Sequence, residues 1–258
     1  MLFDVNAYLG HFAFRQLRHN TADGLLRQMD AKGIDRALVS SASAITYRNA
    51  QSGNEELDEA VRGHRDRLIP LAVINPAYAG WEDDLKICCD QFGMRGFRLY
   101  PKWHNYALTD ACAQQLIAAA AEQHLLVSIP IRVEDYRQRS WLVDVPDVPL
   151  AEIVPLVKSH PKARFLLVNG LGYSRSPLGR ASDQLPPNYW IEISRISALL
   201  DNELGQLLNN LGPDRLVFGT GMPFKYPDPP LLKLEVLDAP GEFKERIRGR
   251  NAAALVGG

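Results

Sequence analysis

The sequence has few cysteines, no long apolar run and almost no net charge. Its 258 residues include three cysteines, Cys88, Cys89 and Cys112, whose number and spacing fit neither a disulfide framework nor a cysteine metal site. No apolar run approaches the ~20 residues that span a bilayer. The net charge of −1 gives no electrostatic reason to expect nucleic acid or an anionic membrane as a partner. These absences favour a protein of the reducing cytoplasm, with its cysteines as small buried apolar residues.

Glycine-rich phosphate-binding turns are also missing, which weighs against the open, doubly wound sheet of nucleotide-binding proteins. Instead, apolar segments typical of strands alternate with segments of helical periodicity along the whole chain. The predicted strands are residues 3–10, 36–41, 68–76, 96–101, 125–132, 164–170, 189–194 and 215–221. The predicted helices are residues 22–32, 55–64, 81–92, 109–123, 150–159, 202–211 and 243–255.

Eight strands alternating with helices over about 250 residues predict an α/β protein with a (β/α)8 TIM barrel. No shift in composition marks a boundary, so we expect residues 1–258 to form one domain. The functional groups of such a barrel lie at the C-terminal ends of its strands and in the loops that follow.

The first strand carries a row of polar residues. Asp4, Asn6 and Tyr8 alternate with Val5 and Ala7, which predicts that the polar row lines the inner wall of the barrel. Such a row is costly to bury unless each group is hydrogen-bonded. The row therefore predicts either a hydrogen-bonded interior layer or the floor of a site.

Polar residues also alternate with apolar ones near the ends of the other strands. If the apolar residues face the helices, the polar ones face the mouth of the barrel, which is the opening at the C-terminal ends of the strands. Arginines that converge in a cleft favour a planar anion such as a carboxylate. We expect general acid–base groups and a donor to a developing oxyanion beside it. The predicted catalytic residues are Glu192, Tyr8, His11 and His104. The predicted substrate-binding residues are Asn6, Asn75, Arg98, Tyr100, Lys102, Arg132, Asn169 and Ser194. In the alternative interpretation, Arg98 and Glu192 pair as structural ions inside the barrel.

Four motifs at strand ends, taken together, resemble the amidohydrolase-related family of TIM-barrel hydrolases and decarboxylases, most of which depend on a metal. The resemblance extends over essentially the whole chain and implies the barrel fold and a homodimer. The motifs are residues 4–8 (Asp-Val-Asn-Ala-Tyr), 96–101 (Gly-Phe-Arg-Leu-Tyr-Pro), 169–172 (Asn-Gly-Leu-Gly) and 218–223 (Phe-Gly-Thr-Gly-Met-Pro).

The sequence departs from the family pattern at the metal-binding positions. Asn6 and Tyr8 stand where the family's first strand has histidines, and Asn169 stands at the histidine of the sixth. Gly221 replaces the eighth-strand aspartate, which is also the family's proton-transfer group. Zinc is held by imidazole, thiolate and carboxylate ligands. We therefore expect neither a metal nor another cofactor here.

These features favour a metal-independent hydrolase or lyase that acts on a small carboxylate-bearing molecule at the mouth of the barrel. One alternative is a catalytically inactive family member that binds a small molecule or a partner subunit. The other is a metal-dependent hydrolase with unusual ligands, for which His11, His104 and Glu192 are the candidates.

Overall fold

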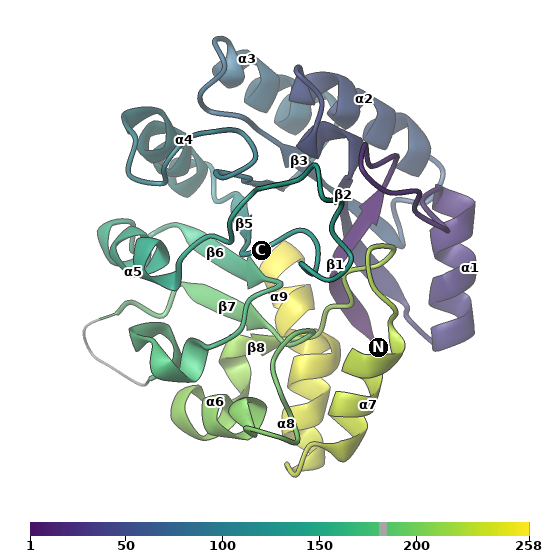
Figure 1. Ribbon diagram of the computed structural model, residues 1–258, viewed down its shortest axis with the longest axis vertical. Helices are drawn as coiled ribbons and strands as arrows, with labels where there is room; N and C mark the ends of the chain where they lie inside the picture. Colours follow the sequence, from purple (N-terminus) through teal and green to yellow (C-terminus); the bar gives the residue numbers. More distant parts are fainter. Residues whose placement is uncertain (181–184, 258) are drawn as a thin grey trace.

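Eight parallel strands form the centre of the molecule, and helices surround them (Figure 1). The computed structural model describes residues 1–180 and 185–257. The strands pair in chain order from the first to the eighth. They are β1 (Phe3–Leu9), β2 (Arg36–Ser41), β3 (Leu68–Val73), β4 (Gly96–Arg98), β5 (Leu126–Pro130), β6 (Arg164–Val168), β7 (Tyr189–Glu192) and β8 (Leu216–Val217).

Backbone hydrogen bonds from β1 to the chain just after β8 close the ring. Val5 N donates to Phe218 O at 3.0 Å, and Tyr8 N donates to Met222 O at 2.8 Å. The prediction of an α/β TIM barrel is therefore confirmed. The helices are α1 (Ala22–Lys32), α2 (Ala50–Val61), α3 (Trp81–Lys86), α4 (Ala111–Glu122), α5 (Leu150–Ser159), α6 (Glu203–Leu211), α7 (Asp228–Val236), α8 (Gly241–Glu245) and α9 (Asn251–Gly257).

The strands are apolar on both faces because one face packs against helices and the other fills the barrel. In β6, Phe165 and Leu167 belong to the apolar layer beneath the helices, whereas Leu166 and Val168 belong to the interior core. Helix α9 contributes Ala252 and Leu255 to that interior core. None of the helices in the described part of the chain has the length and apolarity that crossing a bilayer requires.

Some element boundaries differ from the predicted ones. Helix α2 begins at Ala50 rather than at residue 55, because the Asn49 side chain caps it by accepting a hydrogen bond from Gln51 N at 3.1 Å. The predicted helix 243–255 consists of α8, a π-helical turn and α9 in succession. Strands β4 and β8 are shorter than predicted. Cys88 is buried as expected, whereas Cys89 and Cys112 are half-buried.

Strand β1 contains a β-bulge between Asp4 and Ala7, which corrects the prediction of one continuous polar row. The extra residue in a bulge shifts the alternation of side chains by one position. Consequently Phe3 and Val5 pack in the interior core, and Ala7 packs in the layer beneath the helices. Strict alternation had assigned Val5 and Ala7 to the same face.

Two buried side chains hold the bulge. Asp4 accepts hydrogen bonds from Asn6 N at 2.8 Å and from Thr220 N at 2.9 Å, which joins the bulge to the chain after β8. Burial raises the pKa of Asp4 to about 6, although these hydrogen bonds oppose the increase. Arg98 crosses the barrel from β4 and donates to Val5 O at 3.0 Å and to Ala7 O at 3.1 Å. The carbonyl groups of Val5 and Ala7 at the bulge thus accept hydrogen bonds from a side chain on the opposite side of the barrel.

Replacing Arg98 with Met is expected to lower the free energy of unfolding by about 2–4 kcal/mol, because the carbonyls of Val5 and Ala7 lose buried donors. Urea unfolding followed by circular dichroism measures this loss. Arg62→Met is the matched control, because the Arg62 side chain is 73% exposed and should change stability by less than about 0.5 kcal/mol. Equal effects of the two substitutions would contradict the structural role of Arg98.

Candidate active site

A cluster of buried polar side chains lies where β1, β6 and β7 end. Asn169 Oδ1 accepts hydrogen bonds from Asn6 Nδ2 at 3.1 Å and from Lys225 Nζ at 2.5 Å. Glu192 Oε2 accepts from Asn169 N at 2.9 Å and from Asn6 Nδ2 at 3.4 Å. We call Asn6, Asn169, Glu192, Ser194 and Lys225 the polar cluster. The fold thus brings together four of the residues predicted from the sequence and adds Lys225.

Glu192 is the only carboxylate of the polar cluster and is fully buried. Besides the donors of Asn6 and Asn169, it accepts hydrogen bonds from both the backbone N–H and the hydroxyl of Ser194, the latter at 3.0 Å. Gly219 permits the close approach of the chain just after β8, because a Cβ there would lie 2.5 Å from Glu192 Cγ. These contacts hold the carboxylate in one position.

Lys225 occupies the space next to Gly221 and is a residue that sequence reasoning missed. A Cβ added at Gly221 would lie 3.1 Å from Lys225 Cδ and 3.5 Å from Asn169 Oδ1. Gly221 has a φ of 78°, a left-handed conformation that glycine adopts without strain. The available signal was a lysine four positions beyond a glycine that stands where the resembling family has an aspartate.

Burial is the main reason that the pKa of Lys225 falls to about 8. The nearby cations Arg195, Lys233 and Arg132 lower it further, whereas Glu192 opposes the shift. Near neutral pH, Lys225 is therefore a cation that gives up its proton much more readily than an ordinary lysine.

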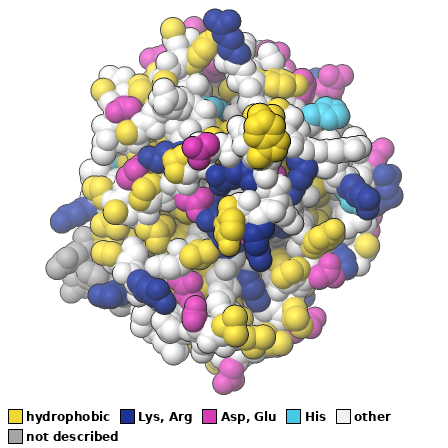
Figure 2. Space-filling view, viewed as in Figure 1, with side chains coloured by type: hydrophobic (Ala, Val, Ile, Leu, Met, Phe, Trp, Pro, Cys, Tyr) yellow, Lys and Arg dark blue, Asp and Glu magenta, His cyan; other side chains and the backbone are white. Residues whose placement is uncertain are grey.

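A pocket of about 600 Å³ opens beside Lys225. Figure 2 shows Lys and Arg side chains gathered near the centre of the face crossed by the segment between β5 and α5. The wall of the pocket beside Lys225 includes the strand-end residues Ser194, Arg195 and Thr220. It also includes residues from the loops after β5 and β8. The other lining residues are Asp135, Arg137, Gln138, Lys225, Tyr226, Pro229 and Pro230.

Cations outnumber carboxylates around this pocket. Arg137 pairs with Asp135 at 3.0 Å, and Arg132 pairs with Asp147 nearby. These two arginines are therefore neutralised by partners on the same segment between β5 and α5.

Three further cations have no such partner. Arg195 donates to Asn169 O at 3.3 Å, and Lys233 donates to the carbonyls of Ile193 and Ser194. Within residues 1–180 and 185–257, neither they nor Lys225 form an ion pair. Glu192 lies near all three cations, and Asp135 and Asp147 also lie near Arg195, but the latter two already pair with Arg137 and Arg132. The surroundings of the pocket therefore carry excess positive charge, which suits an anion.

Aromatic side chains fill the other side of the mouth. Tyr8, Phe12 and Phe224 meet edge to face, with Phe224 at 5.0 Å from each of the other two ring centres. Trp103 packs against Phe12 at 5.7 Å. We call these four side chains the aromatic plug. The aromatic plug lies on the side of the mouth near β1, and the pocket beside Lys225 lies on the side near the ends of β7 and β8.

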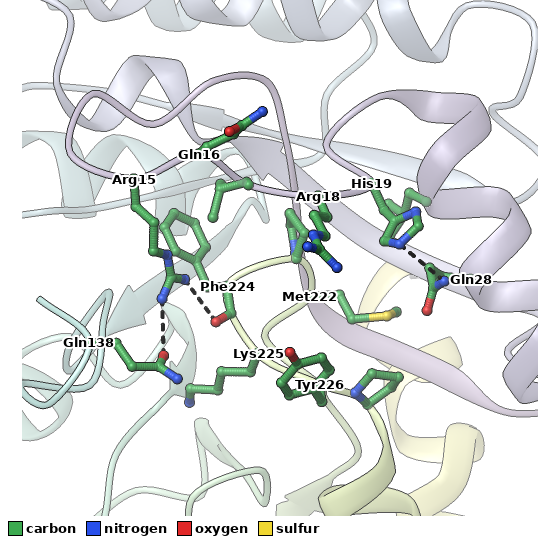
Figure 3. A pocket seen from close by; sticks show the side chains of 14 residues that line it. Arg15, Gln16, Arg18, His19, Gln28, Gln138, Met222, Phe224, Lys225 and Tyr226 are labelled. Carbon is green, nitrogen blue, oxygen red and sulfur yellow. Dashed lines mark hydrogen bonds between the residues drawn. The ribbon is translucent and has the colours of Figure 1, made fainter.

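Arg15 fastens the loops over the plug. Its guanidinium donates to Phe224 O at 2.9 Å and to Gln138 Oε1 at 3.0 Å, and it pairs with the buried carboxylate of Glu134 at 3.3 Å. A second pocket, of about 490 Å³, lies beside it (Figure 3). Figure 3 shows Arg15 and Gln138 at one end of this pocket and His19 at the other. Both pockets share Gln138, Lys225 and Tyr226 as a common wall.

The three cations predicted to bind substrate lie in other environments. Arg98 is fully buried and bonded to β1, so it neither faces the open pocket nor pairs with Glu192. Lys102 pairs with Glu152 at 2.8 Å. Lys102 and Arg132 line a cavity of about 10 Å³, which has room for about one water molecule. The expectation that these cations converge on one anion is thus corrected, because each already has a partner.

Tyr8 and Tyr100 are buried near Arg98. The Arg98 guanidinium lies over the Tyr8 ring at 4.5 Å, and burial is the main cause that raises the pKa of both tyrosines. Neither hydroxyl has a hydrogen-bond partner among the described residues. The catalytic role of Tyr8 and the substrate-binding role of Tyr100 stay predictions.

The predicted histidines and Asn75 lie away from the polar cluster. His11 is exposed and lines a pocket beside α1 and α2, whereas His104 and Asn75 line another near Tyr47. Asn75 accepts a hydrogen bond from Ala77 N at 3.1 Å and so closes a turn. His11, His104 and Glu192 are therefore not brought together as a ligand set.

The residues present do not fit the metal that the resembling family implies. In the described part of the chain, no three His, Cys, Asp or Glu side chains are grouped closely enough to hold a metal ion. Amide groups of Asn6 and Asn169 and the ammonium of Lys225 meet at the corresponding positions. An ammonium group repels a metal cation and donates hydrogen bonds instead of accepting a coordinate bond.

The strands and the helical layer define a TIM barrel, and the polar cluster lies at its C-terminal end. A model of the amidohydrolase family matches residues 11–258. The chain therefore belongs to the amidohydrolase family, as the motifs predicted. A comparison with curated proteins found no match.

Solved structures with the same fold include several decarboxylases. The 2,6-dihydroxybenzoate decarboxylase from Rhizobium has 16% identity and a TM-score of 0.73, with 98% of this chain and 97% of that chain covered. A dihydroxybenzoic acid decarboxylase from Polaromonas sp. JS666, with bound manganese and the inhibitor 2-nitroresorcinol, has 15% identity and a TM-score of 0.71, covering 98% and 96%. An uncharacterised TIM-barrel protein from Bordetella bronchiseptica has 14% identity and a TM-score of 0.74, covering 99% and 98%.

The environment of His104 predicts a specific acid sensitivity. Burial lowers the pKa of His104 to about 4, and both ring nitrogens lack partners among the described residues. Between pH 6.5 and 4 the unfolded chain binds a proton that the folded chain does not, so stability falls as the pH decreases. His104→Phe is expected to remove about 1–2 kcal/mol of the loss between pH 7 and pH 5 in urea unfolding.

His64→Gln is the control for this measurement, because the His64 side chain is 41% exposed. It should leave the acid-induced loss of stability essentially unchanged. An unaltered pH dependence in His104→Phe would contradict the burial of a neutral imidazole.

Proposed function

We propose that this amidohydrolase-family protein is a metal-independent enzyme, a lyase or hydrolase, acting on a small carboxylate-bearing molecule. The substrate occupies the open pocket beside Lys225, and its carboxylate lies between Arg195 and Lys225. The observation that carries the proposal is the position of Lys225, whose stem fills the space beside Gly221 and whose ammonium joins the polar cluster.

The charge balance supports a carboxylate as the bound group. Arg195 presents a planar guanidinium, which binds carboxylates with two parallel hydrogen bonds. Its pKa is lowered chiefly by burial and further by Arg132, whereas Asp147, Asp135 and Glu192 oppose the shift, and a bound anion would stabilise the buried guanidinium further. The decarboxylases among the structural neighbours act on aromatic carboxylates by their names, which is consistent with this class of substrate.

The polar cluster supports chemistry without a metal. Lys225 supplies a positive charge where negative charge develops on the substrate, which is the role of an electrostatic catalyst. Asn169 orients the ammonium, and Glu192 fixes Asn169 through its backbone N–H. Glu192 as a general acid or base stays a prediction.

An inactive binding protein is the second candidate, and the aromatic plug favours it. Tyr8 and Phe224 fill one side of the mouth, which leaves less space for a substrate beside the polar cluster. A protein of this kind would bind the carboxylate without changing it, and turnover assays separate the two candidates.

Isothermal titration calorimetry with benzoate tests the bound group. Benzoate is expected to bind at least about tenfold more tightly than the neutral benzamide, a difference of about 1.4 kcal/mol. Arg195→Met and Lys225→Met should each weaken benzoate binding by about tenfold or more, because each removes a charge from the pocket. Lys162→Met is the control, since Lys162 is exposed on the turn before β6. Equal affinity for benzoate and benzamide would contradict the carboxylate site.

Elemental analysis of the purified protein tests metal independence. We expect less than stoichiometric zinc, iron and manganese, because the polar cluster offers one carboxylate and an ammonium instead of a ligand set. Treatment with EDTA should leave benzoate affinity unchanged. One tightly bound metal ion per chain would overturn this part of the proposal.

A further inference from the structure

Among the described residues that line the open pocket, Lys225 carries the one primary amine. The two aliphatic hydroxyls on its wall are engaged: Ser194 Oγ donates to Glu192 at 3.0 Å, and Thr220 Oγ1 donates to Asp4. The third hydroxyl is the phenol of Tyr226, which cannot form an imine. Lys225 Nζ donates to a neutral amide oxygen of Asn169 and can leave it without breaking an ion pair. No cysteine lines this pocket.

We infer that Lys225 Nζ forms an imine with a small 3-oxo acid whose carboxylate is held by Arg195. This inference rests on the proposed function, because it uses the same pocket and the same anion site. It goes further by naming the reacting atom, the class of substrate and the type of reaction.

The surroundings of Lys225 favour the neutral amine that an imine requires. Burial is the main cause that lowers the pKa of Lys225 to about 8, and Arg195, Lys233 and Arg132 contribute against the opposing effect of Glu192, so a substantial fraction is unprotonated at mildly alkaline pH. A lysine that is desolvated or placed next to another cation is an activated nucleophile. The geometry contributes independently, since Nζ and the Arg195 guanidinium both lie near Asn169.

The reaction balances without a further reactant. The amine adds to the ketone carbon, and loss of one water gives the imine, which is protonated. The bond between the carboxylate and C2 then breaks, carbon dioxide leaves, and its electron pair forms an enamine while the imine nitrogen becomes neutral. A proton taken up at C2 regenerates an imine, and water hydrolyses it to the ketone and the free amine of Lys225.

Lys233 is a natural control within the same chain. Burial lowers its pKa to about 8, as for Lys225, but its ammonium donates to the backbone carbonyls of Ile193 and Ser194. It does not line the open pocket. A reaction that depended on pKa alone would therefore modify both lysines, whereas a reaction that depends on the site would modify only Lys225.

Reductive trapping tests the inference. The full-length protein is incubated with acetoacetate or benzoylacetate and sodium cyanoborohydride, and the labelled lysine is located by peptide mass spectrometry. We expect one adduct per chain at Lys225, at least about tenfold above any other lysine, with a labelling rate that rises through a midpoint near pH 8. The mass of the adduct reports whether carbon dioxide has left before reduction.

Two variants separate the reaction from general folding effects. Lys225→Arg keeps the charge but has no primary amine, so it should abolish the adduct, and Lys233→Arg should retain the adduct. Absence of labelling with both oxo acids, or equal labelling of Lys225 and Lys233, overturns the imine. Benzoate binding without labelling would leave the carboxylate site standing, whereas loss of both would remove the proposed function as well.

Discussion

The contact between Arg98 and the bulge of β1 is the constraint on which the mouth of the barrel depends. A guanidinium in the centre of a barrel needs acceptors, and the carbonyls of Val5 and Ala7 provide them. Those carbonyls turn towards the interior at the bulge, where the ladder to β2 is interrupted. The guanidinium and the bulge therefore stabilise each other. Together they position the side chain of Asn6 within the polar cluster.

The polar cluster is consistent with an internal ammonium in place of a metal ion. A metal ion needs several anionic or imidazole ligands, whereas an ammonium needs oxygen acceptors and one compensating charge. Asn169 supplies the acceptor, Glu192 supplies the charge, and Gly221 leaves room for the stem of Lys225. Asn6, Asn169, Glu192 and Lys225 thus form one hydrogen-bonded set.

The mouth is divided into an apolar half and a charged half. Phe12, Phe224 and Trp103 cover the end of β1 on one side, and Arg15 ties their loops together. On the other side, Arg195 and Lys225 face the open pocket. The proposed anionic ligand is therefore placed on the charged half of the mouth, where the positive charge is in excess.

The sequence by itself determined the barrel, because the alternation of apolar strands and amphipathic helices is local and repeats along the chain. It also identified Asn6, Asn169, Glu192 and Ser194 as neighbours, since parallel strands place their C-terminal ends on one face. Only the tertiary structure decided the rest. The bulge depends on a donor from the opposite strand, and the pairing of Lys102, Arg132 and Arg98 depends on long-range contacts. Lys225 lies in a loop without periodicity, so only the folded chain brings its amine to the site.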